Sequence, residues 1–507
     1  MITPTLSEIV PEINEFKKCF SSAVKNGKSC GPDNISSKDL KLHEQTSVSS
    51  LFKVFCKSVE HGSFPSNWKT ARVSSLYKNK GSKKDCGNYR PISLLSIPSK
   101  VVEKFICNAL VGHLESFNLF SNFQWGFRKQ SSCEDLLLHM TEKWLKSIDS
   151  GKVVVLFIDF QKAFDSVAHP ILLNKLAGCG ISGSFLEYIK SYLDNRSQYT
   201  IINGVSSDKA NVRYGVPQGS ILGPNCFSSY INDMPSKVNP NDGELDMFAD
   251  DTTVFEEGDT VDLTMSKMIV TAKKVEDYSK RNSLTIHPGK CKILVISKKP
   301  FIGPLKAVKL NGKVVECVPN AECLGLTIDQ HLNWEAHISE LCQKFYAKIK
   351  KLYTMRAMAK TTLLTIYFQG ILPSVLYAIL IWGSSNRLQD LQNIHLKAAR
   401  FIMRVKKSVP DYEVLKKAKW KPIEYYYKRS IASKAFKIFN NLSPKLLSSL
   451  ISKSDKRKNR NSFKLELPKY NYVGFKKSFR YRTTNVWNVL PIELRQKTYN
   501  QFRKGLT

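Results

Sequence analysis

The sequence predicts an α+β fold, and three observations along the chain support this prediction. Residues 153–158 form an unbroken apolar run with the length and β-branched composition of a buried strand. Residues 247–255 place apolar side chains on both sides of Asp250 and Asp251, which is the pattern of two strands joined by a tight turn. From Ile338 onward, apolar residues recur every three or four positions, which is typical of helices.

The composition bounds the class of protein. The chain has 507 residues, of which 42% are apolar and 24% charged, as in ordinary globular proteins of several subdomains. Its 77 Lys and Arg against 43 Asp and Glu give a net charge of +34, which indicates a polyanionic partner, nucleic acid before membrane. The last third, residues 340–507, holds 36 Lys and Arg but 8 Asp and Glu, an excess too local for a merely solvated surface.

Cysteines and apolar segments exclude other classes. The twelve cysteines form no Cys-x-x-Cys pair, which argues against structural zinc and for reduced thiols inside a cell. The N-terminus lacks a secretory pattern. The longest apolar run, residues 371–382, is interrupted by Pro373 and is too short to span a bilayer. We therefore expect this run to be a core helix, and we expect no membrane partner.

Three carboxylates stand at the predicted strand ends. Asp159 ends the first buried strand, and Asp250 with Asp251 occupies the turn. Adjacent aspartates repel each other, so cations stabilise a turn that concentrates them, although an acidic surface turn is the commoner origin of Asp-Asp alone. A strand-end carboxylate combined with an acidic turn is the ligand set for two-metal phosphoryl transfer, with two Mg²⁺ about 3.5–4 Å apart. Mn²⁺ is the alternative ion.

Seven segments stand out along the chain: residues 88–95, 124–128, 158–167, 215–224, 248–251, 284–292 and 323–329. Together and in this order, they resemble the motifs of the reverse transcriptases of non-LTR (LINE-type, jockey-like) retrotransposons. The resemblance runs from about Gly31 to the end of the chain and is most specific between Trp68 and Asp329.

This resemblance implies a right-hand polymerase, in which fingers and palm surround an antiparallel sheet and an α-helical thumb and a basic C-terminal region follow. The implied divisions are residues 1–150 for the N-terminal segment and fingers, 151–337 for the palm with a primer-grip-like hairpin, 338–410 for the thumb and 411–507 for the C-terminal region. The implied reaction is RNA-directed DNA synthesis from dNTPs on an RNA template, with a DNA primer or target. The implied location is a cytoplasmic ribonucleoprotein and the nucleus.

The resemblance also implies the site residues. Asp159, Asp250 and Asp251 would be catalytic and would hold two Mg²⁺, with the backbone carbonyl of Phe160 as a further ligand. Phe164 matches the aromatic residue that lies under the sugar and excludes a 2′-hydroxyl, and a core phenylalanine is the alternative. The residues predicted to bind substrate are Lys78, Arg90, Lys162, Ala163, Phe164, Gln218, Gly219 and Lys290.

Physical reasons support several of these roles. A basic hairpin carrying Arg90 can offset the roughly four negative charges of a nucleoside triphosphate. The amide of Gln218 can contact the incoming nucleotide or a template base, and Gly219 lets the backbone approach it. Lys290 is a candidate for helping pyrophosphate to leave, with a plain charged turn residue as an equal alternative. Asp165 is assigned to a helix cap and to no chemistry.

The later part of the chain predicts nucleic-acid contacts. Helices are expected over residues 363–380 and 388–405, and a basic helix beginning near Ile338 could track a duplex. Residues 452–460 form a basic linker. Residues 479–482 and 486–491 interleave aromatics with Arg, as single-strand binding needs.

Two alternatives remain open. An RNA-dependent RNA polymerase shares the carboxylates, but Phe164 argues against it. An RNA-binding relic, or a domesticated reverse transcriptase without polymerase activity, would retain the basic surface, but the intact carboxylates and Gln218 argue against it. Full elements usually carry an endonuclease upstream. We expect it to lie on a missing N-terminal part or on another protein.

Overall fold

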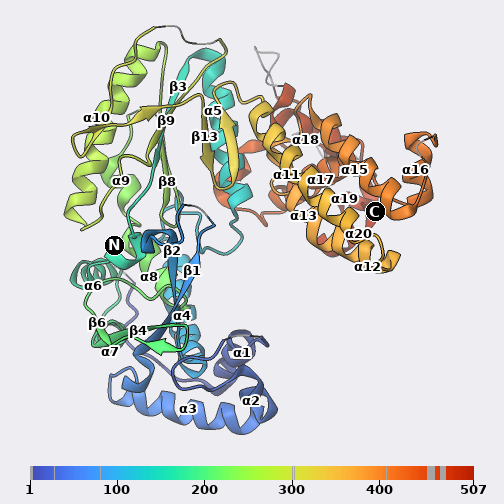
Figure 1. Cartoon of the computed structure of the whole chain (residues 1–507). Coiled ribbons are helices and arrows are strands. Elements are labelled where there is room, and N and C mark those ends of the chain that lie inside the picture. Colours follow the sequence, from blue (N-terminus) through green and yellow to red (C-terminus); the bar gives the residue numbers. More distant parts are fainter. Residues whose placement is uncertain are drawn as a thin grey trace.

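The computed structural model describes residues 4–27, 29–79, 81–241, 243–299, 301, 303–406, 408–453, 463–468 and 476–506. These residues mix helices and strands, so the α+β prediction is confirmed. The strands and the helices up to α10 form one lobe, and the helices from α11 onward form a second lobe beside it (Figure 1). None of the helices in the described ranges combines the length and hydropathy that a bilayer crossing needs.

The sheet that carries the acidic motifs has the strand order β12-β9-β3-β8-β7. Its central strand β3 runs antiparallel to both β8 and β9. Its strands are β3 (Lys152–Ile158), β7 (Glu244–Phe248), β8 (Asp251–Gly258), β9 (Lys292–Ile296) and β12 (Glu316–Cys317).

The apolar run of β3 is buried on both faces because each face meets a different core. Val154 and Leu156 belong to the core that contains the apolar face of α10 (Val261–Arg281). Val153 and Val155 belong to the core that contains α5 (Cys133–Ser150). A strand covered on both faces has no polar alternation, which explains the continuous apolar pattern in the sequence.

A second sheet has the order β2-β1-β4-β5, with β6 paired to β4. The hairpin of β1 and β2 is antiparallel, and β4 joins β1 in parallel. Its strands are β1 (Thr70–Tyr77), β2 (Tyr89–Leu94), β4 (Arg196–Ile202), β5 (Val205–Ser206) and β6 (Ala210–Val212). The smaller strands elsewhere are β10 (Lys309–Leu310), β11 (Lys313–Val314), β13 (Asn320–Cys323) and β14 (Leu326–Asp329).

Helices surround both sheets. The first helix begins only at Ile13, since Leu6 pairs with Ile181 and Pro11 favours extended backbone before it. The remaining helices of this lobe are α1 (Ile13–Ala23), α2 (Ser37–Leu42), α3 (Glu44–Glu60), η1 (Ser66–Trp68), η2 (Cys86–Asn88), α4 (Ile97–Ser116), η3 (Ala163–Ser166), α6 (His169–Gly178), α7 (Gly183–Leu193), α8 (Gly223–Tyr230) and α9 (Met234–Val238).

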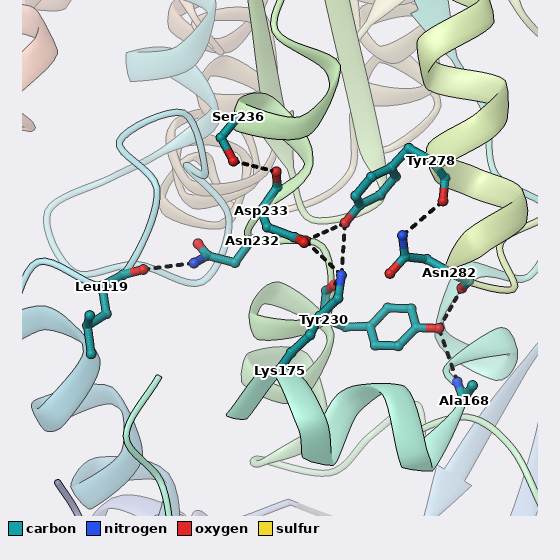
Figure 2. Close-up of polar contacts among 9 residues, drawn as sticks. All are labelled: Leu119, Ala168, Lys175, Tyr230, Asn232, Asp233, Ser236, Tyr278 and Asn282. Atoms are coloured by element: carbon teal, nitrogen blue, oxygen red, sulfur yellow. Dashed lines mark hydrogen bonds and ion pairs between the residues drawn. The ribbon is translucent and has the colours of Figure 1, made fainter. Parts of the chain in front are cut away.

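A polar network around a lysine joins α6, α8 and α10 (Figure 2). The Nζ atom of Lys175 donates to Oδ1 of Asp233 at 2.7 Å and to the carbonyl oxygen of Tyr230 at 2.6 Å. The hydroxyl of Tyr278 donates to the same Asp233 oxygen at 2.7 Å. Burial lowers the pKa of Lys175, and the Asp233 carboxylate opposes this shift. The network therefore fixes the helices that support the turn after β3.

The second lobe consists mainly of helices, with an isolated β-bridge between Lys453 and Leu465. Its elements are α11 (Glu335–Thr354), α12 (Lys360–Thr365), the π-helical η4 (Ile366–Ile371), α13 (Leu372–Val375), α14 (Ile379–Trp382), α15 (Leu388–Met403), α16 (Asp411–Ala418), α17 (Ile423–Phe439), η5 (Lys445–Leu450), α18 (Phe479–Asn488), α19 (Ile492–Arg495) and α20 (Tyr499–Gly505). The helix expected over residues 388–405 is present as α15.

The prediction of one helix over residues 363–380 is wrong. The segment changes from α12 to the π-helical η4, and a turn then separates α13 from α14. Ala378 adopts a positive φ of 50° in that turn, which an α-helix does not allow. The apolar run over residues 371–382 is largely buried as expected, but as two four-residue helices instead of one core helix.

The prediction that aromatic residues near the C-terminus bind single strands by stacking is also wrong for two of these residues. Phe479 is 4% exposed and Trp487 is fully buried, because α18 packs against α17 and α5. Their rings therefore have no free face for a nucleobase. Several residues of the predicted basic segments lie outside the described residues, namely Lys80, Lys456, Arg457, Lys458 and Arg460.

Candidate active site

The two adjacent aspartates lie at the tip of the β7–β8 hairpin. Phe248 pairs with Asp251, which leaves Ala249 and Asp250 as a two-residue loop. Ala249 has a φ of 58°, whereas Asp250 is not among the residues with positive φ. A positive φ at the first loop position alone fits a type II′ turn, which matches the right-handed twist of the flanking strands.

Asp159 lies beside this turn. The β3–β8 register pairs Ile158 with Thr252, so the next step along both strands sets Asp159 against Asp251. Loss of surrounding solvent raises the pKa of Asp251 to about 6, and the negative charges of Asp250, Asp159 and Glu322 add to the shift. The three predicted carboxylates are therefore close enough to repel one another.

The pKa of Asp250 is also raised. Loss of solvent is the largest cause, and the charge of Asp159 acts in the same direction. Arg90 opposes the shift, so its guanidinium lies within electrostatic reach of the turn. Anionic carboxylates that are destabilised in this way gain from a cation placed among them.

The donor set fits divalent cations. Oδ2 of Asp159 is buried without a hydrogen-bond partner, and Nζ of Lys290 lies 3.5 Å from it. Phe160 and Ile286 form an isolated antiparallel bridge, and the residues beside them make its hydrogen bonds. The Gln161 N–H donates to the Thr285 carbonyl at 2.8 Å, and the His287 N–H donates to the Asp159 carbonyl at 2.9 Å. In such a pair the carbonyl of the central residue points to the opposite edge, here toward β8 and the aspartates.

A different group of potential ligands is more tightly clustered. Within the described residues, the ligand atoms of His139, Glu244 and Asp246 all lie within 4.8 Å of one another, and the three predicted aspartates are spaced more widely. His139 and Glu244 share a 2.8 Å hydrogen bond, Lys143 pairs with Glu244, and the Trp125 indole donates to Asp246 at 2.9 Å. Because each member already has a protein partner, we interpret this cluster as a structural network along β7.

The basic residues of the β1–β2 hairpin divide into two groups. Arg90 pairs with Leu76 in the hairpin and reaches the electrostatic environment of Asp250. Lys78 instead donates from Nζ to the carbonyl of Gly87 at 2.9 Å, near the hairpin's loop. Arg90 therefore acts electrostatically on the acidic turn, whereas Lys78 lies at the outer end of the hairpin.

The turn after Asp159 packs against the loop at residues 215–219. The Val216 N–H donates to the Phe164 carbonyl at 2.9 Å, and the Gln218 side chain donates to Asp165 at 3.3 Å. Lys162 begins the turn with a φ of 49° and is exposed, whereas Ala163 is buried. Thus the turn that carries Lys162, Ala163 and Phe164 packs on the loop that carries Gln218 and Gly219, directly after the strand that leads to Asp159.

Gly219 is required by a close approach of two backbones. It has a φ of 126°, and a Cβ placed on it would lie 2.5 Å from the carbonyl oxygen of Ser93. The Ser93 N–H donates to the Gln218 carbonyl at 2.7 Å. This contact joins the loop to β2, so the loop and Arg90 are held by the same hairpin.

Sequence reasoning missed two acidic residues. Glu103 on α4 is 1% exposed, and its carboxylate accepts hydrogen bonds from the N–H groups of Ile221 at 2.7 Å and Leu222 at 3.3 Å. Burial raises its pKa, and the charge of Arg196 opposes the shift. A charged residue on an apolar helix face was the available signal. The charge of Glu322 on β13 helps to raise the pKa of Asp251. The two residues are far apart in the sequence, so no local pattern connects them.

Comparisons with known proteins identify a family for the central part of the chain. Residues 79–328 match the family described as "Reverse transcriptase (RNA-dependent DNA polymerase)". The chain is 26% identical over 388 residues to the RNA-directed DNA polymerase from mobile element jockey of Drosophila melanogaster. The aligned region covers 75% of this chain and 42% of that protein. It is 29% identical over 404 residues to the probable RNA-directed DNA polymerase from transposon X-element of the same organism, covering 77% and 44%.

A more distant relative is the Pol polyprotein of the type-1 retrotransposable element R1 of Bradysia coprophila, 24% identical over 311 residues, which covers 61% of this chain and 30% of that protein. The chain spans less than half the length of these curated relatives. Residues 79–328 therefore form a reverse-transcriptase domain, and the chain is similar to the RNA-directed DNA polymerases of non-LTR retrotransposons.

Proposed function

We propose that this chain is an RNA-directed DNA polymerase that extends a primer 3′-hydroxyl on an RNA template by two-metal phosphoryl transfer. One observation carries the proposal: Asp159 is set against Asp251 by the β3–β8 register, next to a turn that presents Asp250. Oδ2 of Asp159 accepts no hydrogen bond from the described part of the chain and lies 3.5 Å from the positive charge of Lys290, which supports a cation-binding role for this group.

In this proposal Asp159, Asp250, Asp251 and the carbonyl of Phe160 hold two Mg²⁺, or Mn²⁺. Bound there, the ions would lower the pKa of the primer hydroxyl and offset the charge of the leaving pyrophosphate. The carboxylates orient their oxygens from two adjacent strand ends, so the rigid sheet sets the geometry. A preorganised ligand set does not need to rearrange during the reaction.

Two basic residues would receive the triphosphate. Arg90 acts electrostatically on Asp250, and Nζ of Lys290 lies 3.5 Å from Asp159. Both can offset negative charge that the dNTP brings and that pyrophosphate carries away. Lys78 would contribute from the hairpin's outer end when the hairpin closes over the nucleotide.

The sugar and the base would meet the turn after Asp159. Phe164 would lie under the ribose and exclude a 2′-hydroxyl, while Gln218 and Gly219 would contact the nucleotide from the neighbouring loop. Lys162 and Ala163 would line the same pocket. The packing of residues 215–219 on this turn supports a single shared pocket.

We further propose the right-hand arrangement. Residues 1–150 would form the fingers, 151–337 the palm and primer-grip-like hairpin, 338–410 the thumb and 411–507 the basic C-terminal region. The helical lobe from α11 onward supports a thumb that begins near residue 338. Described helices of the 411–507 region pack on α15 and α5, so this region would work together with the thumb.

The partners would be an RNA template, a DNA primer or target, and dNTPs. An endonuclease would come from another part of the element or from another protein, and the complex would act as a cytoplasmic ribonucleoprotein and in the nucleus. The charge of +34 supports nucleic-acid partners.

Primer extension on an RNA template tests the proposal. The purified chain is given an annealed DNA primer, Mg²⁺ and either dNTPs or rNTPs. We expect efficient extension with dNTPs and little with rNTPs. Equal extension with rNTPs would indicate an RNA polymerase, and tight primer–template binding without any extension would indicate an RNA-binding relic.

A further inference from the structure

Residues 123–126 extend the central sheet beside the catalytic hairpin. The N–H of Met247 donates to the carbonyl of Phe123, and the N–H of Trp125 donates to the carbonyl of Met247, both at 2.8 Å. β7 is the edge strand of its sheet, and this short segment pairs with it in parallel. β7 is therefore hydrogen-bonded along both of its edges, to β8 on one side and to residues 123–126 on the other.

The side chain of Gln124 reaches from this segment to the acidic turn. Gln124 is 1% exposed, and its Oε1 accepts hydrogen bonds from the N–H of Gly126 at 2.9 Å and the N–H of Ala249 at 3.2 Å. Ala249 is the residue immediately before Asp250. Both contacts are backbone donors, so they require the amide oxygen on this side and fix its orientation.

The other half of the amide lacks a partner. Nε2 of Gln124 is buried and has no hydrogen bond within the described residues. Leaving a buried donor unpaired is unfavourable. If position 124 only filled space in the core, an apolar side chain would do so without this cost. The feature that an apolar residue cannot supply is the acceptor for Ala249.

Gly126 allows this approach. A Cβ placed on Gly126 would lie 2.4 Å from the backbone nitrogen of Ala249, so only glycine leaves the turn in its present position. At the next residue, the indole N–H of Trp125 donates to Asp246 on β7 at 2.9 Å. Side-chain and backbone bonds thus tie the segment to both the strand and the turn.

Ala249 needs an external restraint. Its φ of 58° is a conformation that non-glycine residues adopt only when the surroundings impose it. A turn without that restraint would sample other conformations, and these would move the carboxylate of Asp250.

From these contacts we infer that Gln124 is a positioning residue, which holds the Ala249 N–H so that the turn keeps Asp250 and Asp251 directed at Asp159. The inference deepens the proposed function and rests on it for the step from geometry to catalysis. Gln124 does not touch the reacting atoms, and its effect passes through the turn.

The test compares Gln124→Met with Gln392→Met. Methionine retains most of the volume and removes the acceptor. Gln392 is a matched control because its Oε1 also accepts a backbone N–H, that of Ile423 at 2.7 Å, but in the helical lobe. We expect hydrogen exchange at the Ala249 amide, measured by mass spectrometry with residue-level fragmentation, to be about tenfold faster or more in Gln124→Met and unchanged in Gln392→Met.

Metal binding and kinetics give the second readout. Gln124→Met should weaken Mn²⁺ binding followed by electron paramagnetic resonance, raise the Mg²⁺ concentration for half-maximal extension, and lower kcat about tenfold or more. The primer–template Kd should not change. A merely structural residue would change thermal stability in both methionine variants and leave the Mg²⁺ dependence as it is.

Two results would overturn the inference: unchanged exchange at Ala249 in folded Gln124→Met, or faster exchange with unchanged Mn²⁺ binding. If Gln124→Met does not fold, Gln124→Glu serves as the test instead, because the glutamate side chain retains an oxygen acceptor. It should preserve slow exchange at Ala249, and fast exchange there would also contradict the inference. If the wild type extends no primer, the proposed function fails, and exchange and Mn²⁺ binding alone decide the positioning role.

Discussion

The rings of Phe164 and Phe227 stack with their centroids 4.5 Å apart and their planes inclined by 23°. Phe227 on α8 is fully buried, whereas Phe164 on the turn after Asp159 is half-buried. The core therefore fixes one face of the Phe164 ring without covering the whole residue. A ring held in this way can serve as both a core residue and a sugar-contacting surface, so the two interpretations from the sequence are compatible.

Phe164→Val should relax the discrimination between dNTPs and rNTPs. A smaller side chain leaves room for a 2′-hydroxyl, so kcat/KM for rNTPs should rise about tenfold or more relative to dNTPs. Steady-state primer extension with each nucleotide measures the ratio. The exposed Phe117, outside the site, gives the control Phe117→Val. An identical ratio in wild type and Phe164→Val would leave Phe164 as a core residue only.

Glu142 on α5 gives the structure a pH-dependent element. It is 2% exposed and accepts hydrogen bonds from the N–H groups of Phe479 at 2.6 Å and Arg480 at 3.3 Å. Burial raises its pKa from 4.5 to about 7, and these N–H groups and the charge of Arg480 oppose the shift. The folded protein therefore binds this proton more tightly than the unfolded chain does.

Because the pKa of Glu142 is higher in the folded protein than in the unfolded chain, protonation of Glu142 stabilises the folded state. This contribution is fully present below pH 4.5 and is lost as the pH rises through about 7. Glu142→Gln removes this titration. Its free energy of unfolding, relative to wild type, should therefore increase between pH 5 and 7, by at most about 1.4 kcal/mol per pH unit. Urea unfolding at several pH values measures the difference. Glu424→Gln, at an exposed position, is the control. A difference that stays constant with pH would contradict the assignment.

The basic surface of α11 should contribute to nucleic-acid affinity. Four exposed lysines project from this helix: Lys344, Lys348, Lys350 and Lys351. Replacing all four with Gln should reduce the slope of log Kd against log salt by about three if each contacts a phosphate, since a contact contributes about 0.7 to 0.9.

The control for this prediction replaces four exposed lysines on α1 and α2, namely Lys17, Lys18, Lys38 and Lys41. This set should leave the slope unchanged, and equal slopes for all proteins would contradict a role for α11. Truncating the chain is a poorer test, because Lys434 forms a buried 2.5 Å ion pair with Asp135 on α5. Removing the later helices would expose that core as well as remove charge.

Local patterns predicted the elements that carry the carboxylates. The apolar run of β3, the β7–β8 hairpin and the helix α15 each form near their expected bounds. The helix expected over residues 363–380 is interrupted by the π-helical η4 and by the positive φ of Ala378, which the residue type alanine does not signal.

Contacts between distant segments could not be predicted in the same way. Gln124 and Ala249 are 125 residues apart, and no local rule connects a buried amide to one particular turn. The arginines and aromatics near the C-terminus matched the composition of a single-strand surface. The structure instead buries Phe479 and Trp487, because composition does not distinguish a stacking surface from the packed face of a helix.

Single-turnover primer extension by Asp250→Asn tests the central claim, metal-dependent polymerisation at this turn, most directly. The substitution retains the shape of the side chain and removes one anionic ligand, which should cost several kcal/mol of transition-state stabilisation, about a thousandfold in rate or more. Asp277→Asn, which removes an exposed aspartate paired with Lys273 at 3.3 Å on α10, should extend the primer like wild type. Primer–template binding should be retained in both. Extension by Asp250→Asn within about tenfold of wild type would contradict the assignment of Asp250 as a metal ligand.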